Sequence, residues 1–335
     1  MTLPFRPPKF WRSRVGLLAL ALSPWAALYG AAAAARLRRA APSAALPTIA
    51  VGGLTLGGDG KTPATLALAR MLLDHGERPA ILARGYGGAR ESADPLRVDP
   101  ARHAADDVGD EALLLAAVAP TYVGGDRAAS ARRAQTQGAT VLLLDDGLHG
   151  RHLEPDLSIL VVDAGYGAGN GLCPPAGPLR APLAAQLARI DAAILIGDGE
   201  PPAWLRQKLL TRASLAPDPA AAAALCGARV FAVAGIGRPE KFARSLKQVG
   251  AELFGFRWFA DHHEYSQEEL ARLECEARRL SSRLVTTEKD ARRLGARRGF
   301  EVLPVTLDFA APEAVAQRLG ESIAAARAAR CCGQT

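Results

Sequence analysis

The glycine-rich segment TIAVGGLTLGGDGKTP, residues 48–63, has the composition of a phosphate-binding loop. An apolar run leads into glycines whose backbone N–H groups can point at phosphate oxygens, and a helix N-terminus adds partial positive charge. Lys61 would reach the outer phosphates of a nucleoside triphosphate, and the Thr62 hydroxyl would hold Mg²⁺. The residues predicted to bind nucleotide are Thr55, Leu56, Gly57, Gly58, Asp59, Gly60, Lys61 and Thr62. The strict motif has glycine where this chain has Thr55, so a glycine-rich turn without a ligand is the alternative.

An acid pair after a second apolar run would complete such a nucleotide site. Residues 141–144 are Val-Leu-Leu-Leu, and Asp145 and Asp146 follow them. A carboxylate at the end of a strand beside the phosphate-binding loop is well placed to bind Mg²⁺. The predicted metal ligands are therefore Thr62, Asp145 and Asp146, and a buried strand ending in a solvated acid pair is the alternative. A dinucleotide site is disfavoured, because the Arg-Gly-Tyr at residues 84–86 offers no acid for a ribose diol.

Two further polar motifs could serve the acceptor of a phosphoryl group. Asp110 and Glu111 lie near a predicted helix start, where acids commonly match the helix dipole, and where Asp110 could also act as a base. His262 and His263 follow an apolar strand. A metal site there lacks a second His or Cys cluster, and a hydrogen-bonded loop histidine is the plainer alternative.

The elements that must position these residues alternate between strands and helices. Strands are expected at 48–52, 80–83, 121–123, 141–144, 158–162, 192–196, 230–234, 252–259, 284–286 and 302–305. Helices are expected at 61–74, 107–118, 126–137, 239–250, 266–280 and 312–329. Strands interleaved with helices predict an α/β fold, with a parallel sheet of the P-loop NTPase type flanked by helices. The predicted segments are an N-terminal membrane-associating helix at 1–40, a P-loop core at 41–222, a smaller C-terminal α/β lobe at 223–330 and a tail at 331–335, with a joint at 216–224.

The N-terminal segment carries the whole excess of positive charge. Lys and Arg number 41 and Asp and Glu number 34, and residues 1–39 hold seven bases and no acid, so the remainder balances at 34 against 34. A basic groove for nucleic acid is therefore disfavoured, and neither a nucleic-acid partner nor an obligate protein partner is predicted. An anionic membrane surface is favoured instead. The seven bases are Arg6, Lys9, Arg12, Arg14, Arg36, Arg38 and Arg39.

An uncharged run at residues 15–35 lies between these bases. As a helix it would be about 31 Å long, close to the thickness of a bilayer core. A helix lying in the membrane interface is favoured, with Trp11, Trp25 and Tyr29 at the level of the headgroups. A signal peptide, a spanning helix and a buried helix of a soluble domain are the alternatives.

General composition narrows the class of protein further. Apolar residues make up 49% and charged residues 22% of the chain, so an intrinsically disordered or collagen-like protein is excluded. Five cysteines show no paired spacing, so neither a disulfide framework nor a zinc site is predicted.

Taken together, the ordered motifs resemble the tetraacyldisaccharide 4'-kinase family over about residues 10–310. The resemblance adds several short segments to the loop and the acid pair. They are Ala83–Tyr86, Gly109–Glu111, Leu144–Gly147, Gly169–Gly171, Pro175–Arg180, Arg238–Glu240, Phe259–His262 and Thr287–Ala291. This family also has threonine or serine at the position of Thr55, which removes the objection raised by the strict motif.

The resemblance implies an enzyme dependent on ATP and Mg²⁺ at the cytoplasmic face of the bacterial inner membrane. It implies transfer of phosphate to the 4'-hydroxyl of an acylated glucosamine disaccharide 1-phosphate, which gives the 1,4'-bisphosphate in lipid A synthesis. Asp110 and His262 take the catalytic positions of the family. A P-loop ATPase recruited to the membrane as a switch, without lipid kinase activity, is the alternative function.

This chain departs from the family pattern near the loop. Gly53 replaces a usual asparagine, and Asp59 replaces a small or hydroxyl residue. A carboxylate beside the phosphates would repel ATP unless it faced solvent. Ala181 also replaces a glutamate, so any role of that glutamate is absent here.

Overall fold

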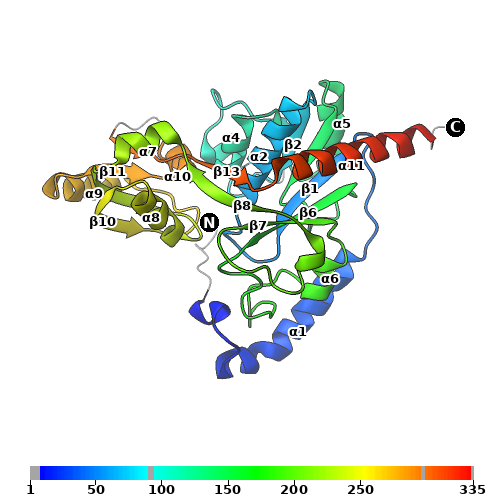
Figure 1. Cartoon of the computed structure of the whole chain (residues 1–335), viewed down its shortest axis with the longest axis horizontal. Coiled ribbons are helices and arrows are strands. Elements are labelled where there is room, and N and C mark those ends of the chain that lie inside the picture. The colour runs from blue at the N-terminus through cyan, green and yellow to red at the C-terminus, as the bar shows by residue number, and fades with distance from the viewer. Residues whose placement is uncertain (1–7, 90–93, 296–298, 333–335) are drawn as a thin grey trace.

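A computed structural model describes residues 8–89, 94–295 and 299–332 (Figure 1). Arg6 and the last three residues of the predicted tail lie outside the described residues. The strands are β1 Thr48–Gly53, β2 Pro79–Ala83, β3 Leu96–Arg97, β4 Thr121–Val123, β5 Val141–Asp145, β6 Leu157–Asp163, β7 Ala192–Ile196, β8 Leu209–Pro217, β9 Arg229–Ala234, β10 Glu252–Trp258, β11 Arg283–Thr286, β12 Phe300–Val302 and β13 Val305–Phe309. The α-helices are α1 Leu17–Leu37, α2 Lys61–Asp74, α3 Ala105–Val108, α4 Asp110–Ala116, α5 Arg127–Thr136, α6 Leu183–Leu187, α7 Pro219–Leu225, α8 Pro239–Gln248, α9 Gln267–Arg279, α10 Glu288–Leu294 and α11 Pro312–Cys332.

The larger sheet places the ends of several strands at one edge. Its order is β13-β8-β7-β6-β1-β5-β2-β4-β3, and the pairings are parallel except those of the outermost strands β3 and β13. Strand β1 therefore lies between β5 and β6, and its Val51 is in register with Asp145 of β5. Because parallel strands end at the same edge of a sheet, the loops after β1, β5 and β6 meet there.

Helices cover both faces of this sheet, as its strands of continuous burial require. On one face, Leu68 of α2 and Leu319 of α11 pack with Ile49 of β1 in a single apolar cluster. On the other face, Ala131 of α5 packs against Leu142 of β5. The predicted α/β fold with a parallel sheet flanked by helices is confirmed.

The smaller lobe has its own parallel sheet, ordered β10-β9-β11-β12. Phe242 of α8 packs in one cluster with Val230 of β9, and Leu270 of α9 packs in a second cluster with Phe231. The predicted capping box of α9 is present: the Ser266 hydroxyl accepts from the Glu269 N–H, and the Glu269 carboxylate accepts from the Ser266 N–H.

The chain returns from the smaller lobe to the larger sheet. Strand β13 pairs antiparallel with β8, and Val315 of α11 belongs to the core cluster of the larger sheet. The predicted lobe at 223–330 is therefore too long, because residues from 305 onward belong to the core. The predicted tail is also wrong at its start, because α11 extends to Cys332.

Several other predictions of local structure need correction. The helix expected at 107–118 is two helices, α3 and α4, separated at Gly109, whose φ is +86°. A side chain at Gly109 would place Cβ 2.6 Å from the Tyr86 carbonyl oxygen, so only glycine fits this bend. Strands β3 and β8 and helices α6 and α10 were not predicted. The strand expected at 302–305 is wrong, because these residues join the end of β12 to the start of β13. The predicted joint at 216–224 holds the end of β8 and most of α7.

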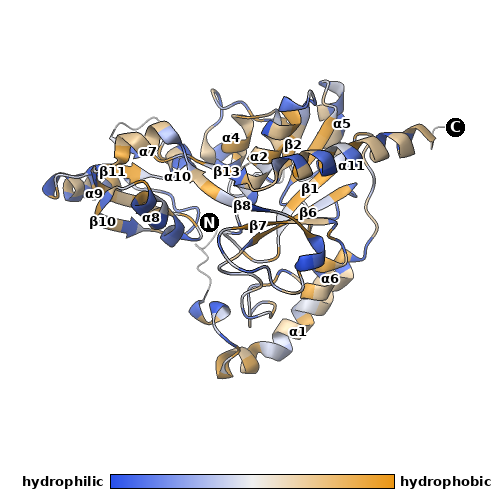
Figure 2. Ribbon diagram, viewed as in Figure 1, coloured by the Kyte–Doolittle hydropathy of each residue, from blue (hydrophilic) through white to orange (hydrophobic). Residues whose placement is uncertain are grey.

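Helix α1 packs against the larger domain beside α6, at the lower edge of the view (Figures 1 and 2). Its buried residues are Ala19, Ala26, Gly30, Ala33 and Leu37, which form one stripe of small and apolar side chains. The opposite side exposes Leu17, Leu18, Leu20, Trp25, Leu28 and Tyr29. Among the described residues this is the one helix whose length and composition suffice to cross a membrane.

Candidate active site

The loop between β1 and α2 has the backbone of a phosphate-binding loop. Gly57, Gly58 and Gly60 have φ of +88°, +66° and +88°, a region that other residues rarely adopt. A Cβ at Gly60 would also lie 2.6 Å from Ile196 Cδ1. Helix α2 begins at Lys61, so the loop leads directly into a helix N-terminus. This strand–loop–helix unit supports the phosphate-binding role predicted for residues 55–62.

The long loop after β6 holds the phosphate-binding loop in place. The Leu56 N–H donates to the Pro178 carbonyl, and Arg180 Nε donates to the Thr55 carbonyl at 3.0 Å. Arg180 Nη1 then reaches Asp146 Oδ2 at 2.7 Å. Arg180 therefore ties the loop after β1 to the acid pair after β5.

The two predicted metal ligands of the acid pair have different surroundings. Asp146 Oδ1 lies 3.5 Å from Lys61 Nζ, and with Arg180 on the other oxygen the pKa of this carboxyl is held far below its usual range despite burial. Asp145 accepts a hydrogen bond from Thr65 Oγ1, but burial and the charges of Glu111 and Asp146 raise its pKa to about 6.

This donor set fits Mg²⁺. Asp146 Oδ1 is buried and accepts no hydrogen bond, and Asp145, the neighbouring carboxylate, is also buried. No group of three or more His, Cys, Asp or Glu suited to a metal occurs in the described ranges. Mg²⁺ needs fewer, because it is usually bound by one or two carboxylates together with substrate phosphates and water.

Asp59 does not face solvent. The expectation that only a solvent-facing carboxylate would avoid repelling ATP is therefore not met in that way. The Asp59 side chain is buried, and its charge is offset by Arg238, whose Nη2 lies 3.0 Å from Asp59 Oδ1. Gly53, the second departure, lies against it: a Cβ at Gly53 would be 2.2 Å from Asp59 Oδ2. The two departures are therefore sterically linked.

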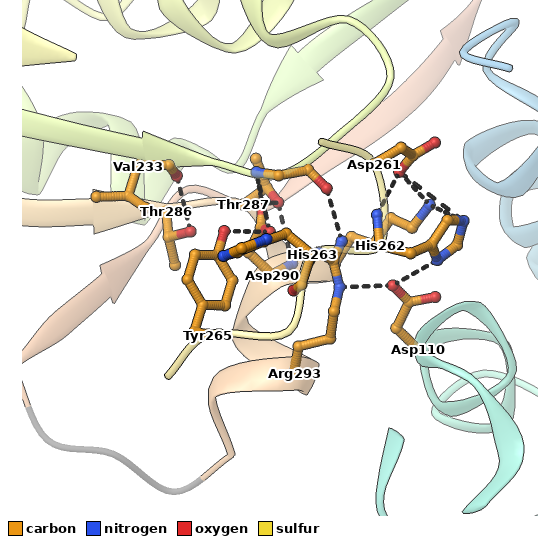
Figure 3. A network of polar contacts seen from close by, with 12 residues as sticks. Asp110, Val233, Asp261, His262, His263, Tyr265, Thr286, Thr287, Asp290 and Arg293 are labelled. Atoms are coloured by element: carbon orange, nitrogen blue, oxygen red, sulfur yellow. Dashed lines mark hydrogen bonds and ion pairs between the residues drawn. The ribbon is translucent and has the colours of Figure 1, made fainter. Parts of the chain in front are cut away.

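The structure brings Asp110 and His262 together from different lobes (Figure 3). Asp110 is the first residue of α4 and is buried, and its Oδ2 lies 3.2 Å from His262 Nδ1. Asp110 Oδ1 accepts from the Glu111 N–H at 2.7 Å. His262 has a φ of +60°, a strained conformation of the kind that is found at functional sites.

Two cations of α10 that were not predicted as site residues complete this cluster. Arg293 Nε lies 2.7 Å from Asp110 Oδ2, and Lys289 Nζ lies 3.0 Å from Glu111 Oε1 and 3.2 Å from His262 Nε2. Lys289 lies in the segment Thr287–Ala291, which resembles the family, and Arg293 lies one helical turn beyond it in α10. Although Asp110 is buried, its hydrogen bond with His262 and the charges of Lys289 and Arg293 hold its pKa far below the usual range.

Glu111 connects the acceptor cluster to the acid pair. It forms an ion pair with Lys289, and its charge helps to raise the pKa of Asp145. The two candidate halves of the site, one for nucleotide and one for acceptor, are therefore neighbours.

Removing the Arg293 cation tests the strength of this contact between lobes. We expect Arg293→Met to lower the free energy of unfolding by about 3 kcal/mol, because breaking a buried ion pair leaves Asp110 with less neutralising charge. Urea denaturation measures this loss. Arg292→Met is the matched control, since Arg292 is exposed and its loss should change stability by about 0.5 kcal/mol or less. Equal stability of the two variants would contradict the prediction.

Comparisons with known proteins identify the family to which this chain belongs. The family model for tetraacyldisaccharide-1-P 4'-kinase matches residues 18–324. This chain belongs to the tetraacyldisaccharide 4'-kinase family. A family member from Methylobacterium nodulans is 52% identical over 320 residues, covering 93% of this chain and 94% of the relative. Another, from Rhodopseudomonas palustris (strain CGA009), is 44% identical over 340 residues, covering 98% and 99%.

A solved structure agrees with the family assignment at the level of the fold. LpxK from Aquifex aeolicus, crystallised in complex with ATP, superposes with a TM-score of 0.69 at 24% identity, covering 92% of this chain and all of that one. The fold of this tetraacyldisaccharide 4'-kinase family member is therefore that of LpxK.

Proposed function

We propose that this chain transfers the γ-phosphoryl group of ATP to the 4'-hydroxyl of an acylated glucosamine disaccharide 1-phosphate. The family assignment supports the reaction class, and the observation that carries the proposal is the junction between the two lobes. There, the loop followed by Lys61 lies near the cluster of the Asp110–His262 pair, since a Cβ at Gly237 would lie 3.5 Å from the Gly58 nitrogen of the loop and 3.3 Å from Asp261 Oδ2.

The nucleotide half of the site neutralises charge. Loop amides and the N-terminus of α2 favour the phosphates, and Lys61 supplies a positive charge for the group being transferred. Asp145, Asp146 and Thr62 would hold Mg²⁺, which when bound screens the negative charge of the phosphates. Arg180 keeps Asp146 and the loop in a fixed relation before nucleotide enters.

The acceptor half of the site handles the proton of the sugar hydroxyl. Arg293 and Lys289 keep Asp110 ionised, so this carboxylate is ready to accept a hydrogen bond from the hydroxyl and to orient His262. Lys289 can donate to His262 Nε2, which leaves the ring proton on Nδ1, facing Asp110. We propose that the Asp110 carboxylate accepts the proton of the hydroxyl as the oxygen attacks phosphorus in line, and that the His262 Nδ1–H donates to this carboxylate and orients it.

Phosphate transfer to lipid tests this function. Purified protein would be incubated with radiolabelled ATP, Mg²⁺ and the extracted disaccharide lipid, and labelled lipid and free phosphate would be separated. The proposal expects label on the lipid. ATP hydrolysis without labelled lipid would instead identify the alternative, a P-loop ATPase that acts as a switch.

We also propose that α1 lies in the interface of the inner membrane from the cytoplasmic side. A stripe of α1 is buried against the domain along the whole helix, so a spanning orientation would draw the domain into the bilayer. The opposite side exposes leucines and aromatics, and basic residues occur at both ends of the helix. The acyl chains of the substrate could then stay in the bilayer while its sugar headgroup enters the site.

Charge on the exposed side of α1 should weaken this membrane contact. We expect Leu17→Asp combined with Leu20→Asp to move most of the protein from the membrane pellet to the supernatant, because burying each leucine is worth about 1.5–3 kcal/mol. Sedimentation with anionic vesicles measures the distribution. Leu73→Asp is the matched control, since Leu73 is an exposed leucine of α2 outside this helix. Unchanged pelleting of the double variant would exclude this side of α1 as the anchor.

A further inference from the structure

A buried ion cluster joins the phosphate-binding loop to the smaller lobe. Arg238 immediately precedes α8, and its side chain is 7% exposed. Its two terminal nitrogens each lie 3.0 Å from a carboxylate oxygen, one on Asp59 of the loop and one on Asp163 at the end of β6. Its guanidinium lies 4.2 Å from the centre of the Tyr166 ring, and Lys241 also pairs with Asp163. Two cations thus face two buried carboxylates.

Asp59 shapes the loop from the inside. Its Oδ2 accepts the Thr55 N–H at 3.1 Å, and its Oδ1 accepts the Thr55 hydroxyl at 2.6 Å. The first and fifth residues of the loop are therefore held together by one carboxylate. Burial raises the pKa of Asp59 against the opposing charges of Lys61 and Arg238, so the charged carboxylate depends on these cations.

The Asp59 carboxylate is tightly packed against the backbone at Gly53. A Cβ at Gly53 would lie 2.2 Å from Asp59 Oδ2 and 2.9 Å from Asp59 Cβ, so the carboxylate occupies the volume that a larger residue at 53 would need. A Cβ at Gly58 would lie 2.9 Å from Arg238 Cγ. Arg238 therefore lies directly against the backbone of the loop, on the side of Gly58.

We propose that Arg238 is a positioning residue for the phosphate-binding loop. It keeps Asp59 charged and in place, and Asp59 in turn fixes the conformation in which the loop amides receive phosphate. The smaller lobe thereby controls nucleotide affinity through a residue that contacts Asp59, Asp163 and Tyr166. This inference rests on the ATP binding proposed above.

The effect of Arg238→Met, compared between protein with Asp59 intact and protein with Asp59→Ser, distinguishes this positioning role from direct contact with phosphate. ATP dissociation constants in the presence of Mg²⁺ would be measured by calorimetry for the full chain and for Arg238→Met, each with Asp59 intact and with Asp59→Ser. We expect Arg238→Met to weaken ATP binding about 10-fold when Asp59 is intact and less than about 2-fold in the Asp59→Ser background, since coupled residues are non-additive. The same fold loss in both backgrounds would overturn the proposal, as would no loss in either.

Lys241→Met is the matched control, because it removes a cation from the same cluster without touching Asp59, and it should leave the ATP dissociation constant unchanged. Melting temperatures would be measured for the same variants. If Arg238 had only a structural role, Arg238→Met would lower the melting temperature while the folded protein still bound ATP normally. Failure of the unaltered chain to bind ATP would instead refute the proposed function.

Gly53→Ala provides a second test that leaves Arg238 in place. The added methyl group must displace the Asp59 carboxylate, so we expect ATP binding to weaken about 10-fold when Asp59 is intact. In an Asp59→Gly background no carboxylate is left to displace, so adding Gly53→Ala should change ATP binding by less than about 2-fold. Normal binding by Gly53→Ala, or the same fold loss in the Asp59→Gly background, would overturn the proposal even if Arg238→Met fails to fold.

Discussion

Lys61→Ala is expected to lower the rate of phosphoryl transfer by about 10³-fold or more. Lys61 is the first residue of α2, and its ammonium group lies 3.5 Å from Asp146, beside the acid pair that is proposed to hold Mg²⁺. Its charge is most valuable when negative charge spreads over the transferring group, so the turnover number should fall more than the affinity for lipid. Transfer of label from ATP to the disaccharide lipid measures the effect.

Two controls show whether a loss of activity in Lys61→Ala is specific to this lysine. Lys247→Ala removes an exposed lysine of the smaller lobe and should leave transfer unchanged. Lys61→Ala should also remain folded, because Lys61 belongs to none of the apolar core clusters of the larger domain. Near-normal turnover of Lys61→Ala would refute the phosphate-binding assignment of residues 55–62.

Asp110→Ala and His262→Ala are each expected to lower the turnover number by about 10²–10⁴-fold, the usual contribution of a general base. The change in the Michaelis constant for ATP should be smaller, because the loop, and neither of these residues, is proposed to hold the nucleotide. The two side chains are 3.2 Å apart and come from different lobes, so the acceptor hydroxyl meets both only when the lobes are together. Steady-state kinetics, with the concentrations of ATP and lipid each varied, measures the turnover number and the Michaelis constant separately.

The double variant tests whether this pair acts as a unit. Asp110→Ala combined with His262→Ala should be little slower than the slower single variant, since residues that act together are non-additive. Multiplicative losses would show independent roles. His263 is the internal control: it stacks on Phe259 at 4.5 Å and contacts Glu269, facing the interior of its own lobe, so His263→Ala should keep most activity. If His263 proved essential and His262 dispensable, the catalytic histidine would be His263 and our assignment of His262 would be wrong.

The nucleotide half of the site was predictable from the sequence because its signals are local. A glycine-rich turn between an apolar run and a helix specifies its own conformation, and the predicted helix at 61–74 has the bounds of α2. The acid pair could be placed beside the loop, because parallel strands that end together bring Asp145 into register with β1.

The acceptor half was not predictable in the same way, because its contacts join distant parts of the chain. Nothing local to Asp110 indicates His262 or Arg293, and only the family resemblance paired the first two. Arg238 presents a similar case: its two carboxylate partners lie in the loop after β1 and at the end of β6, and neither segment has a pattern that points to an arginine of the other lobe. The boundary of the smaller lobe was missed because β13 is a short strand whose partner, β8, had not been predicted.

The return of the chain through β13 and α11 has a consequence for how the protein is made. Helix α2, which follows the phosphate-binding loop, shares its core cluster with Leu319 and Ile323 of α11, and the whole smaller lobe is synthesised between these helices. During translation, the part of α2 that packs against β13 and α11 stays uncovered until these two elements emerge from the ribosome. The smaller lobe, whose sheet consists of strands close in sequence, can fold first. A nascent chain halted after β12 should therefore contain a folded smaller lobe attached to a larger domain that is still open to chaperones and proteases.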